Sequence, residues 1–211
     1  AKVPESVIAA SDKCQIVARL GIGLDNIDVA AATRRKIAVT NVPDYCLIEV
    51  AEHAIALLLA LSRKVGWYHH ATKQGVYDLQ SGAKLRRIEG QTLGVIGLGA
   101  IGSAVAKKAL ALGLKVVATS RNRRHGVGGV EWRNLDALLA ESDYVSLHVP
   151  STPETRKMIG AAHLARMKPT AYLINTARGA VVDEAALAAA LAANQLAGAA
   201  LDVQEHEPPD L

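Results

Sequence analysis

The glycine-rich segment at residues 97–102, with the sequence Gly-Leu-Gly-Ala-Ile-Gly, constrains the fold of this chain more than any other feature. The apolar run at 93–96 is typical of a buried strand, and apolar residues recur at helical spacing from Ala104 to Leu112. Residues 114–118 then predict a second strand. A strand, a glycine turn, a helix and a strand within about thirty residues form the unit that binds the diphosphate of a dinucleotide.

The glycines of this segment have separate predicted roles. Gly97 permits the tight turn, Gly99 lets the backbone approach the diphosphate, and Gly102 lets the helix pack against the strand. The N-terminus of the helix that follows faces the negative charge. An ordinary glycine-rich turn between a strand and a helix is the alternative.

Arginines stand where a NAD-binding chain normally carries an acid. That acid lies about 20 residues past the glycines and binds the ribose hydroxyl. Here the position falls near Ser120, no Asp or Glu occurs at 90–130, and Arg121, Arg123 and Arg124 follow. Because guanidinium groups match the geometry and charge of a phosphate, the sequence favours NADP, with NAD as the second choice. A solvated basic loop is the alternative.

Strand and helix patterns alternate along the rest of the chain. Apolar strands are expected near 144–147, 171–175 and 198–202, with helices between them. This alternation predicts an α/β fold with a doubly wound parallel sheet of the Rossmann type, covered on both faces. The Ala-rich segment 185–193 follows acidic residues typical of a helix start, so a helix is expected there.

The first part of the chain reads as a separate unit. Residues 1–42 show strands at 15–18 and 37–40 and a helix at about 29–35, and a dinucleotide-binding domain is expected at 43–211. Two helices are expected within 44–80, at 48–61 and 67–80. The first is nearly all apolar, which indicates burial between layers or between domains.

Composition excludes several classes of function. Bases exceed acids by only four in 211 residues and aromatics make up 3%, which disfavours nucleic acid binding. The longest apolar run, 54–61, is too short to span a bilayer. Cys14 and Cys46 lack the spacing of a metal site, so no metal is expected and a reduced, cytoplasmic setting fits best.

Polar residues follow the last predicted strands, at the edge where doubly wound sheets bind their ligands. His148 follows one strand, Arg178 the next, and Asp202, Glu205 and Glu207 follow the last. The fork of Arg178 suits a bidentate contact with a carboxylate. The alternatives are an arginine that caps strand carbonyls, and a solvated acidic turn at the two glutamates.

These segments resemble the D-isomer-specific 2-hydroxyacid dehydrogenases, which interconvert 2-keto acids and D-2-hydroxy acids. The matching segments, in chain order, are 19–28, 50–53, 97–102, 148–155, 174–179, 182–184 and 200–208. Residues 42–50 are also similar to the C-terminal-binding-protein branch, whose members can act as nucleotide-sensing corepressors. The resemblance implies a nicotinamide coenzyme, a small 2-keto or 2-hydroxy acid substrate, and a homodimer formed through 44–80.

The resemblance also implies residue roles. Arg178 would bind the substrate carboxylate and keto oxygen, and the backbone N–H groups of Gly21, Ile22 and Gly23 would bind the same carboxylate. Glu207 would hydrogen-bond a catalytic histidine and raise its pKa. The coenzyme would be oriented by Asp202, Thr176 and Ala177, and lined by Ile22, Ala100, Ile101, Val149 and Pro150.

The chain departs from the family at its ends. The catalytic histidine is expected downstream of Leu211, and none of the seven histidines matches it. His53 lies on the apolar helix and is expected in the core. The chain therefore reads as a fragment that lacks both ends, with 1–42 as the remnant of a flavodoxin-like substrate domain. We expect an NAD(P)-dependent oxidoreductase; the alternatives are a dinucleotide-sensing, corepressor-like module without turnover, and a nucleotide-binding relic. Retention of Arg178 and Glu207 favours the enzyme.

Overall fold

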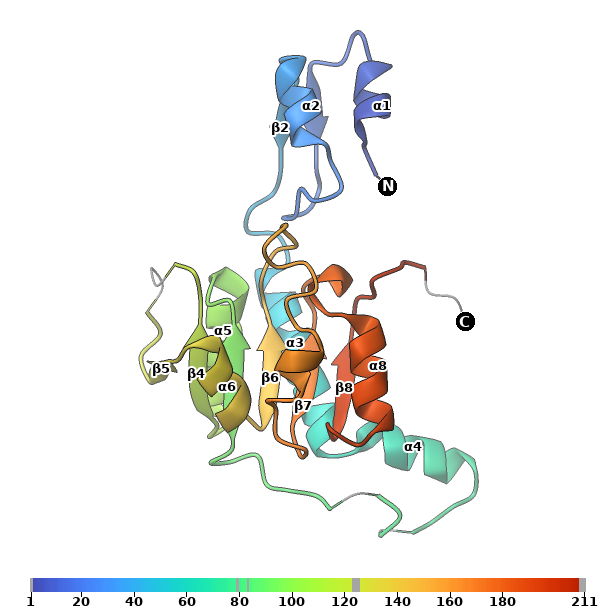
Figure 1. The fold of residues 1–211 in the computed structure, drawn as a ribbon, viewed down its shortest axis with the longest axis vertical. Coiled ribbons are helices and arrows are strands. Elements are labelled where there is room, and N and C mark those ends of the chain that lie inside the picture. The colour runs from blue at the N-terminus through green and yellow to red at the C-terminus, as the bar shows by residue number, and fades with distance from the viewer. Residues whose placement is uncertain (1, 79, 83, 123–125, 209–211) are drawn as a thin grey trace. The chain divides into compact units, whose positions relative to one another are not determined.

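The computed structural model describes residues 2–78, 80–82, 84–122 and 126–208 (Figure 1). The chain divides into two compact units, residues 1–47 and 48–211. The smaller unit contains α1 (Glu5–Ala9), β1 (Ile16–Ala18), α2 (Val29–Arg34) and β2 (Ala38–Thr40). Its two strands are parallel. Asp28 begins α2 by accepting a hydrogen bond from the N–H of Ala31 at 2.8 Å.

The larger unit is built on one parallel six-stranded sheet. Its strands are β3 (Thr92–Ile96), β4 (Lys115–Thr119), β5 (Val130–Trp132), β6 (Tyr144–Leu147), β7 (Tyr172–Asn175) and β8 (Gly198–Leu201). The spatial order β5-β4-β3-β6-β7-β8 corresponds to the 3-2-1-4-5-6 order of dinucleotide-binding sheets. The predicted doubly wound Rossmann-type sheet is therefore confirmed.

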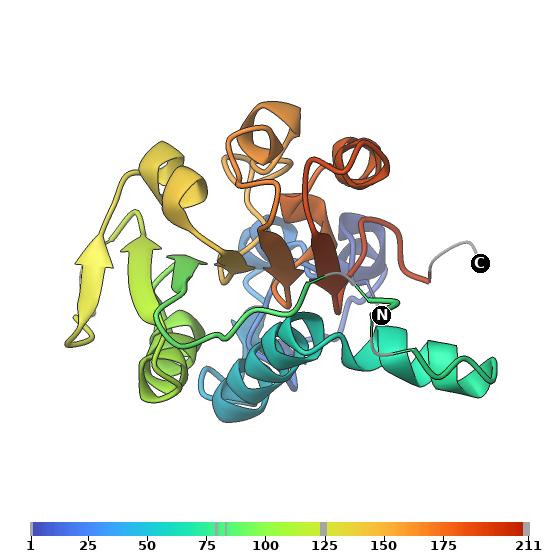
Figure 2. The same ribbon diagram turned by 90° about the horizontal axis from the view of Figure 1, so that it is seen from below.

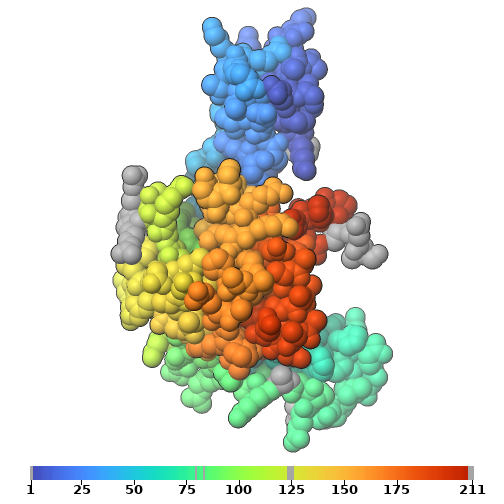
Figure 3. Space-filling model, viewed as in Figure 1, coloured from blue at the N-terminus to red at the C-terminus, as the bar shows by residue number. Residues whose placement is uncertain are grey.

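Helices cover both faces of this sheet (Figure 2). They are α3 (Leu47–Ser62), α5 (Ala100–Ala111), α6 (Leu135–Glu141), α7 (Ala161–Leu164) and α8 (Glu184–Ala192), with a 3₁₀ turn at Gly179–Val181. Helix α4 (Val65–Lys73) follows α3, extends beyond the sheet and buries none of its residues (Figure 2). α3 and α5 lie on one face and α6, α7 and α8 on the other, where their side chains hide the strands in the space-filling view (Figure 3). Within the described residues, no helix has both the length and the hydrophobicity needed to cross a membrane.

Alternating side chains along each strand supply the two core layers. Val116 and Ala118 pack on the α3 and α5 side, whereas Val117 between them packs on the α6 to α8 side. The same alternation separates Ile174 from Leu173. Because both faces are buried, the strands read as continuous apolar runs, which is why the sequence located most of them.

Two elements differ from the sequence-based expectation. β5 was not expected, because this short strand pairs only with β4 at the sheet edge and carries no long apolar run. α4 ends at Lys73 rather than at residue 80, since Gly75 adopts a left-handed φ of +74° that stops the helix. Within its own unit, α3 buries a single stripe that includes Ala51, Ala54 and Leu58, and its predicted burial between domains stays a prediction.

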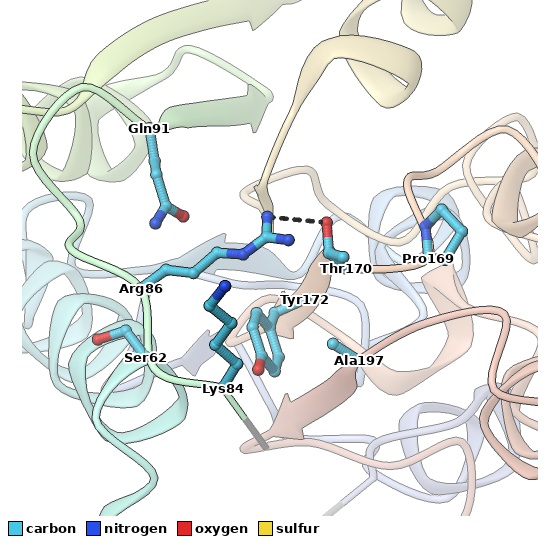
Figure 4. Close-up of a pocket in the computed structure, with 8 residues that line it drawn as sticks. All are labelled: Ser62, Lys84, Arg86, Gln91, Pro169, Thr170, Tyr172 and Ala197. Carbon is cyan, nitrogen blue, oxygen red and sulfur yellow. Dashed lines mark hydrogen bonds between the residues drawn. The ribbon is translucent and has the colours of Figure 1, made fainter.

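A pocket of about 200 Å³ lies at the amino ends of β3, β7 and β8 (Figure 4). It is lined by Ser62, Lys84, Arg86, Gln91, Pro169, Thr170, Tyr172 and Ala197. Arg86 donates to the hydroxyl of Thr170 at 3.3 Å. The lining thus includes two cationic side chains, Lys84 and Arg86, together with Ser62, the last residue of α3. Since ligands of doubly wound sheets bind at the opposite edge, this pocket is not the candidate site.

Candidate functional site

The loops at the carboxyl ends of the strands are tied to one another by backbone hydrogen bonds. The N–H of Gly97 donates to Thr119 at 2.8 Å, and the N–H of His148 donates to Ile96 at 2.7 Å. After the neighbouring strands β7 and β8, the N–H of Asp202 donates to the carbonyl of Asn175 at 3.0 Å. These bonds continue the strand pairing by one residue beyond the strands. They therefore hold the backbone at the start of each loop, where the predicted site residues lie.

The three glycines of the glycine loop differ in the space around them. Gly97 adopts a φ of +96°, and a Cβ there would overlap the carbonyl of His148. Gly102 is equally confined, because its Cβ would overlap the carbonyl oxygen of Gly97. A Cβ on Gly99, by contrast, would meet no atom within 4 Å, and Gly99 is exposed at the start of α5. Space is therefore open only at the glycine expected to face the diphosphate.

Residues Ala100 and Ile101 form the first turn of α5 next to this space, and no side chain caps that helix end. Val149 lies against Gly97, where a Cβ would come within 2.8 Å of Cγ1 of Val149, and Pro150 is exposed beside it. The N-terminus of α5 thus offers its backbone N–H groups and dipole toward an anion.

Ser120 and Arg121 follow β4 directly, as the sequence predicted. Ser120 is half-buried and Arg121 is exposed. Arg123 and Arg124, the other arginines predicted to meet a 2′-phosphate, lie outside the described residues.

The loop after β7 is organised by a buried asparagine to which sequence reasoning gave no role. Asn175 is 1% exposed, accepts from the N–H of Ala177 at 3.0 Å and donates to the carbonyl of Arg178 at 2.9 Å. Arg178 is half-buried and extended in its backbone, and its guanidinium donates to the carbonyl of Ala177 at 2.7 Å. The side chain of Asn175 thus fixes the backbone that carries the predicted substrate-binding arginine.

The turn after β8 is not a simple solvated acidic turn. Glu205 is only 15% exposed in its side chain and lies 3.1 Å from the ammonium of Lys157. The carboxylate of Glu207 is exposed and accepts from the N–H of Gln204 at 3.1 Å. Glu207 therefore has a defined place in the turn and stays accessible to a partner.

The structure corrects the prediction for His53, which was expected in the core. Its side chain is 48% exposed, and its Nε2 lies 3.3 Å from a carboxylate oxygen of Asp202. The buried stripe of α3 passes through Ala51, Ala54 and Leu58, so His53 points away from it. Sequence spacing alone did not reveal that Asp202, after the last strand, lies next to His53 on α3.

His148 has a neutral ring at pH 7. Its Nε2 lies 2.8 Å from the hydroxyl of Ser146, and burial lowers the pKa of the imidazole to about 4. A group with this pKa carries no proton to donate near neutral pH. His148 therefore does not fit the role of the catalytic histidine that the resemblance predicts.

The buried ring of His148 makes stability depend on pH. As the pH falls below about 6.5, the imidazole of His148 becomes protonated in the unfolded chain. In the folded chain the same imidazole becomes protonated only near pH 4. The free energy of unfolding should therefore drop by roughly 3 kcal/mol over this range. Urea unfolding of the wild type and of His148→Gln across the range measures it; identical pH dependence in both proteins would contradict the assignment.

Two buried hydroxyls at this edge lack a protein partner. Among the described residues, Oγ of Ser103 and Oγ1 of Thr176 make no hydrogen bond, although both atoms are buried. Ser103 is in the first turns of α5 and Thr176 follows β7. Within the same residues, no cluster of three or more His, Cys, Asp or Glu is placed to hold a metal ion.

Gly21, Ile22 and Gly23 lie in the smaller unit, in the turn after β1. Asn41 donates to the carbonyl of Ile22 at 2.9 Å, and the guanidinium of Arg19 donates to that of Gly23 at 3.2 Å. These bonds fix the shape of the turn. The predicted contacts of this turn and of Arg178 with one substrate carboxylate stay predictions, because they join residues of the two separate units.

Comparison with known proteins gives one consistent set of matches. A family model described as D-isomer specific 2-hydroxyacid dehydrogenase, NAD binding domain, matches residues 55–211. The D-3-phosphoglycerate dehydrogenase of Synechocystis sp. is 43% identical over 98% of this chain, which covers 38% of that protein. The hydroxypyruvate reductase of Thermotoga maritima is 42% identical over 99% of this chain, which covers 68% of that protein.

A solved structure agrees with these sequence matches. The D-lactate dehydrogenase from Aquifex aeolicus, complexed with NAD and lactic acid, is similar with a TM-score of 0.93 and 38% identity, covering 98% of this chain and 62% of that one. The chain spans 38% and 40% of the length of the first two phosphoglycerate dehydrogenases that it matches.

Proposed function

Because this chain belongs to the D-isomer-specific 2-hydroxyacid dehydrogenase family, we propose that the protein containing it transfers hydride between a nicotinamide coenzyme and a D-2-hydroxy acid/2-keto acid pair. One observation carries this proposal. A glycine loop with open space at Gly99 and the half-buried Arg178 occupy the same carboxyl edge of one sheet.

The residues at this edge fit a dinucleotide. The loop at Gly97, Gly99 and Gly102 and the first turn of α5 would hold the diphosphate by backbone N–H groups. The buried, unpartnered hydroxyl of Thr176 and the carboxylate of Asp202 would face the nicotinamide end. The coenzyme supplies the hydride chemistry, and the protein supplies position and charge.

Arg178 is proposed to bind the substrate. Its fork would hold the carboxylate and polarise the keto oxygen, and the peptide N–H groups at Gly21, Ile22 and Gly23 would bind the same carboxylate. Glu207 would accept a hydrogen bond from the histidine that the family resemblance expects beyond Leu211. A neighbouring carboxylate raises the pKa of that histidine, which keeps it protonated as the donor to the alkoxide oxygen.

Turnover by the protein that contains this chain tests the proposal. We expect reduction of at least one of glyoxylate, hydroxypyruvate and pyruvate. The loss of absorbance of the reduced coenzyme measures this reaction. Tight coenzyme binding without reduction of any 2-keto acid would favour the alternative, a dinucleotide-sensing module. Histidine replacement downstream of residue 211 serves as the inactive control.

We further propose that NADP is preferred over NAD. Arg121 is exposed just past β4, where NAD-binding chains carry an acid. One acid reaches this region from another loop. The hydroxyl of Thr152 lowers the pKa of the Glu154 carboxyl, and the charge of Arg121 lowers it further. Glu154 therefore partly balances the charge of Arg121, and a 2′-phosphate would compete with it.

Substitution of Arg121 by aspartate should weaken NADPH binding about thirtyfold and NADH binding little, because the new carboxylate repels a 2′-phosphate but can accept a bond from a ribose hydroxyl. Fluorescence titration with each coenzyme measures both affinities. Glu154→Gln is the matched variant, and it should bind NADPH more tightly than wild type. Equal losses for the two coenzymes in Arg121→Asp would remove the 2′-phosphate assignment.

A homodimer through residues 44–80 is also proposed. Apolar side chains that remain exposed in this region support it: Ile48, Val65, Trp67 and Tyr77 are 54%, 56%, 56% and 89% exposed. Sedimentation of the whole protein tests it, with Trp67→Lys expected to shift the species toward monomer.

Both cysteines are free thiols, which supports a reducing, cytoplasmic setting.

A further inference from the structure

The turn that carries Glu207 is shaped by its own backbone. The N–H of Gln204 donates to Oε1 of Glu207 at 3.1 Å, so the carboxylate is folded back over the start of the turn. Any shift of the backbone at Gln204 and Glu205 therefore moves the carboxylate. What holds these two residues decides where Glu207 lies.

Two side chains from distant parts of the sequence hold Glu205. The ammonium of Lys157, in the loop between β6 and α7, lies 3.1 Å from the Glu205 carboxylate. The carboxylate of Glu184, the first residue of α8, accepts from the N–H of Glu205 at 2.5 Å. Lys157 thus holds the side chain of Glu205, and Glu184 holds its backbone. We call Lys157 and Glu184 the two anchors of the turn.

Both anchors are themselves fixed. Lys157 has a left-handed φ of +50°, and its N–H donates to the carbonyl of Ala180 at 2.7 Å. Glu184 follows Asp183, whose carboxylate caps α8 by accepting from the N–H of Ala186 at 3.1 Å. The backbone on which each of the two side chains stands is therefore held by further hydrogen bonds.

The turn also lies directly against the residue that follows Arg178. A Cβ on Gly179 would overlap the backbone of Gln204 and Glu205, so only glycine allows this approach. The proposed substrate-binding arginine and the proposed histidine partner are thereby placed through one backbone contact. The acidic, basic and histidine side chains of the turn and of the elements that hold it are Lys157, Arg178, Asp183, Glu184, Asp202, Glu205, His206 and Glu207, with His53 next to Asp202.

We propose that Lys157 and Glu184 are positioning residues that hold Glu207 where it can meet the catalytic histidine. Neither residue touches substrate or coenzyme in this account. The inference rests on the proposed role of Glu207, and it adds two residues that the motif comparison did not connect with catalysis. Loss of either anchor frees the Gln204–Glu207 turn without removing Glu207 itself.

Two pairs of variants test the proposal in the whole protein that contains this chain. Lys157→Met and Glu184→Leu remove the anchors, whereas Lys157→Arg keeps the charge and Glu184→Gln keeps an acceptor oxygen. The removing variants should lower kcat for 2-keto acid reduction about tenfold, since small displacements of catalytic groups have effects of at least this size. Coenzyme affinity should stay unchanged, and the conservative variants should retain most of kcat.

A pH profile separates positioning from mere stabilisation. When Glu207 no longer supports the histidine, the pKa of the histidine falls, so the basic limb of the reduction profile should move to lower pH. Hydrogen exchange at the amides of Gln204 and Glu205 should accelerate in the same variants. Arg166→Met, which breaks the exposed ion pair with Asp136 at 3.2 Å, is the control and should change neither.

The outcome for Glu207→Gln distinguishes two kinds of failure. If this variant shifts the profile but Lys157→Met and Glu184→Leu do not, the two residues are not positioning residues and the inference is overturned. If Glu207→Gln itself leaves the profile unchanged, the proposed role of Glu207 fails, and the inference falls with it.

Discussion

Replacing Arg178 by methionine is expected to lower kcat/KM for 2-keto acid reduction about a thousandfold, because two charge-assisted hydrogen bonds to the substrate are lost. Folding should be preserved, since the side chain of Asn175 bonds the backbone at Ala177 and at position 178, and the substitution keeps both bonds. Steady-state kinetics gives the loss, and fluorescence titration should show coenzyme affinity close to that of the wild type.

The lysine variant gives the matched control for Arg178. Arg178→Lys keeps the charge but loses the planar fork, so it should recover only part of the activity. An arginine that merely capped strand carbonyls would instead give a stability loss with normal kcat/KM in the folded fraction. Near-wild-type kcat/KM in Arg178→Met would remove this residue from the site.

Alanine at Gly99 and alanine at Gly102 are expected to fail in opposite ways. Gly99→Ala should fold like the wild type, because the new Cβ meets no protein atom within 4 Å, but it should bind coenzyme about a hundredfold more weakly. Gly102→Ala should lose roughly 3 kcal/mol of stability, because its Cβ would overlap the carbonyl oxygen of Gly97 and the helix must shift.

Thermal or urea unfolding, combined with coenzyme titration of each variant, separates the two glycines. We expect weaker coenzyme binding without loss of stability in Gly99→Ala, and loss of stability in Gly102→Ala. If Gly99→Ala binds coenzyme normally, the diphosphate does not approach this loop, and the glycines form only an ordinary turn.

The sequence predicted the sheet well because its inner strands are buried on both faces. Runs such as 93–96 and 144–147 consist of side chains that enter both core layers, which leaves a pattern readable without any neighbour. β5 has one neighbouring strand and no such run. The end of α4 depended on the backbone conformation of Gly75, which residue spacing does not reveal.

Site residues divide in the same way. Arg178, Glu207 and the glycines lie in short motifs directly after strands, so their positions followed once the strands were known. The partners His53, Lys157 and Glu184 reach the site from other elements, through contacts that span distant parts of the sequence. Only the folded chain brings these groups together, and sequence reasoning therefore placed His53 in the core and left Glu205 unassigned.

The fate of the transferred hydride tests the central claim most directly. Reduced coenzyme that carries deuterium at both C4 positions of the nicotinamide is incubated with the whole protein and pyruvate or hydroxypyruvate, and the product is analysed by mass spectrometry and chiral separation. We predict a D-2-hydroxy acid that carries the deuterium at C2. An L-2-hydroxy acid, or coenzyme that binds tightly while no 2-hydroxy acid gains deuterium, would contradict the account.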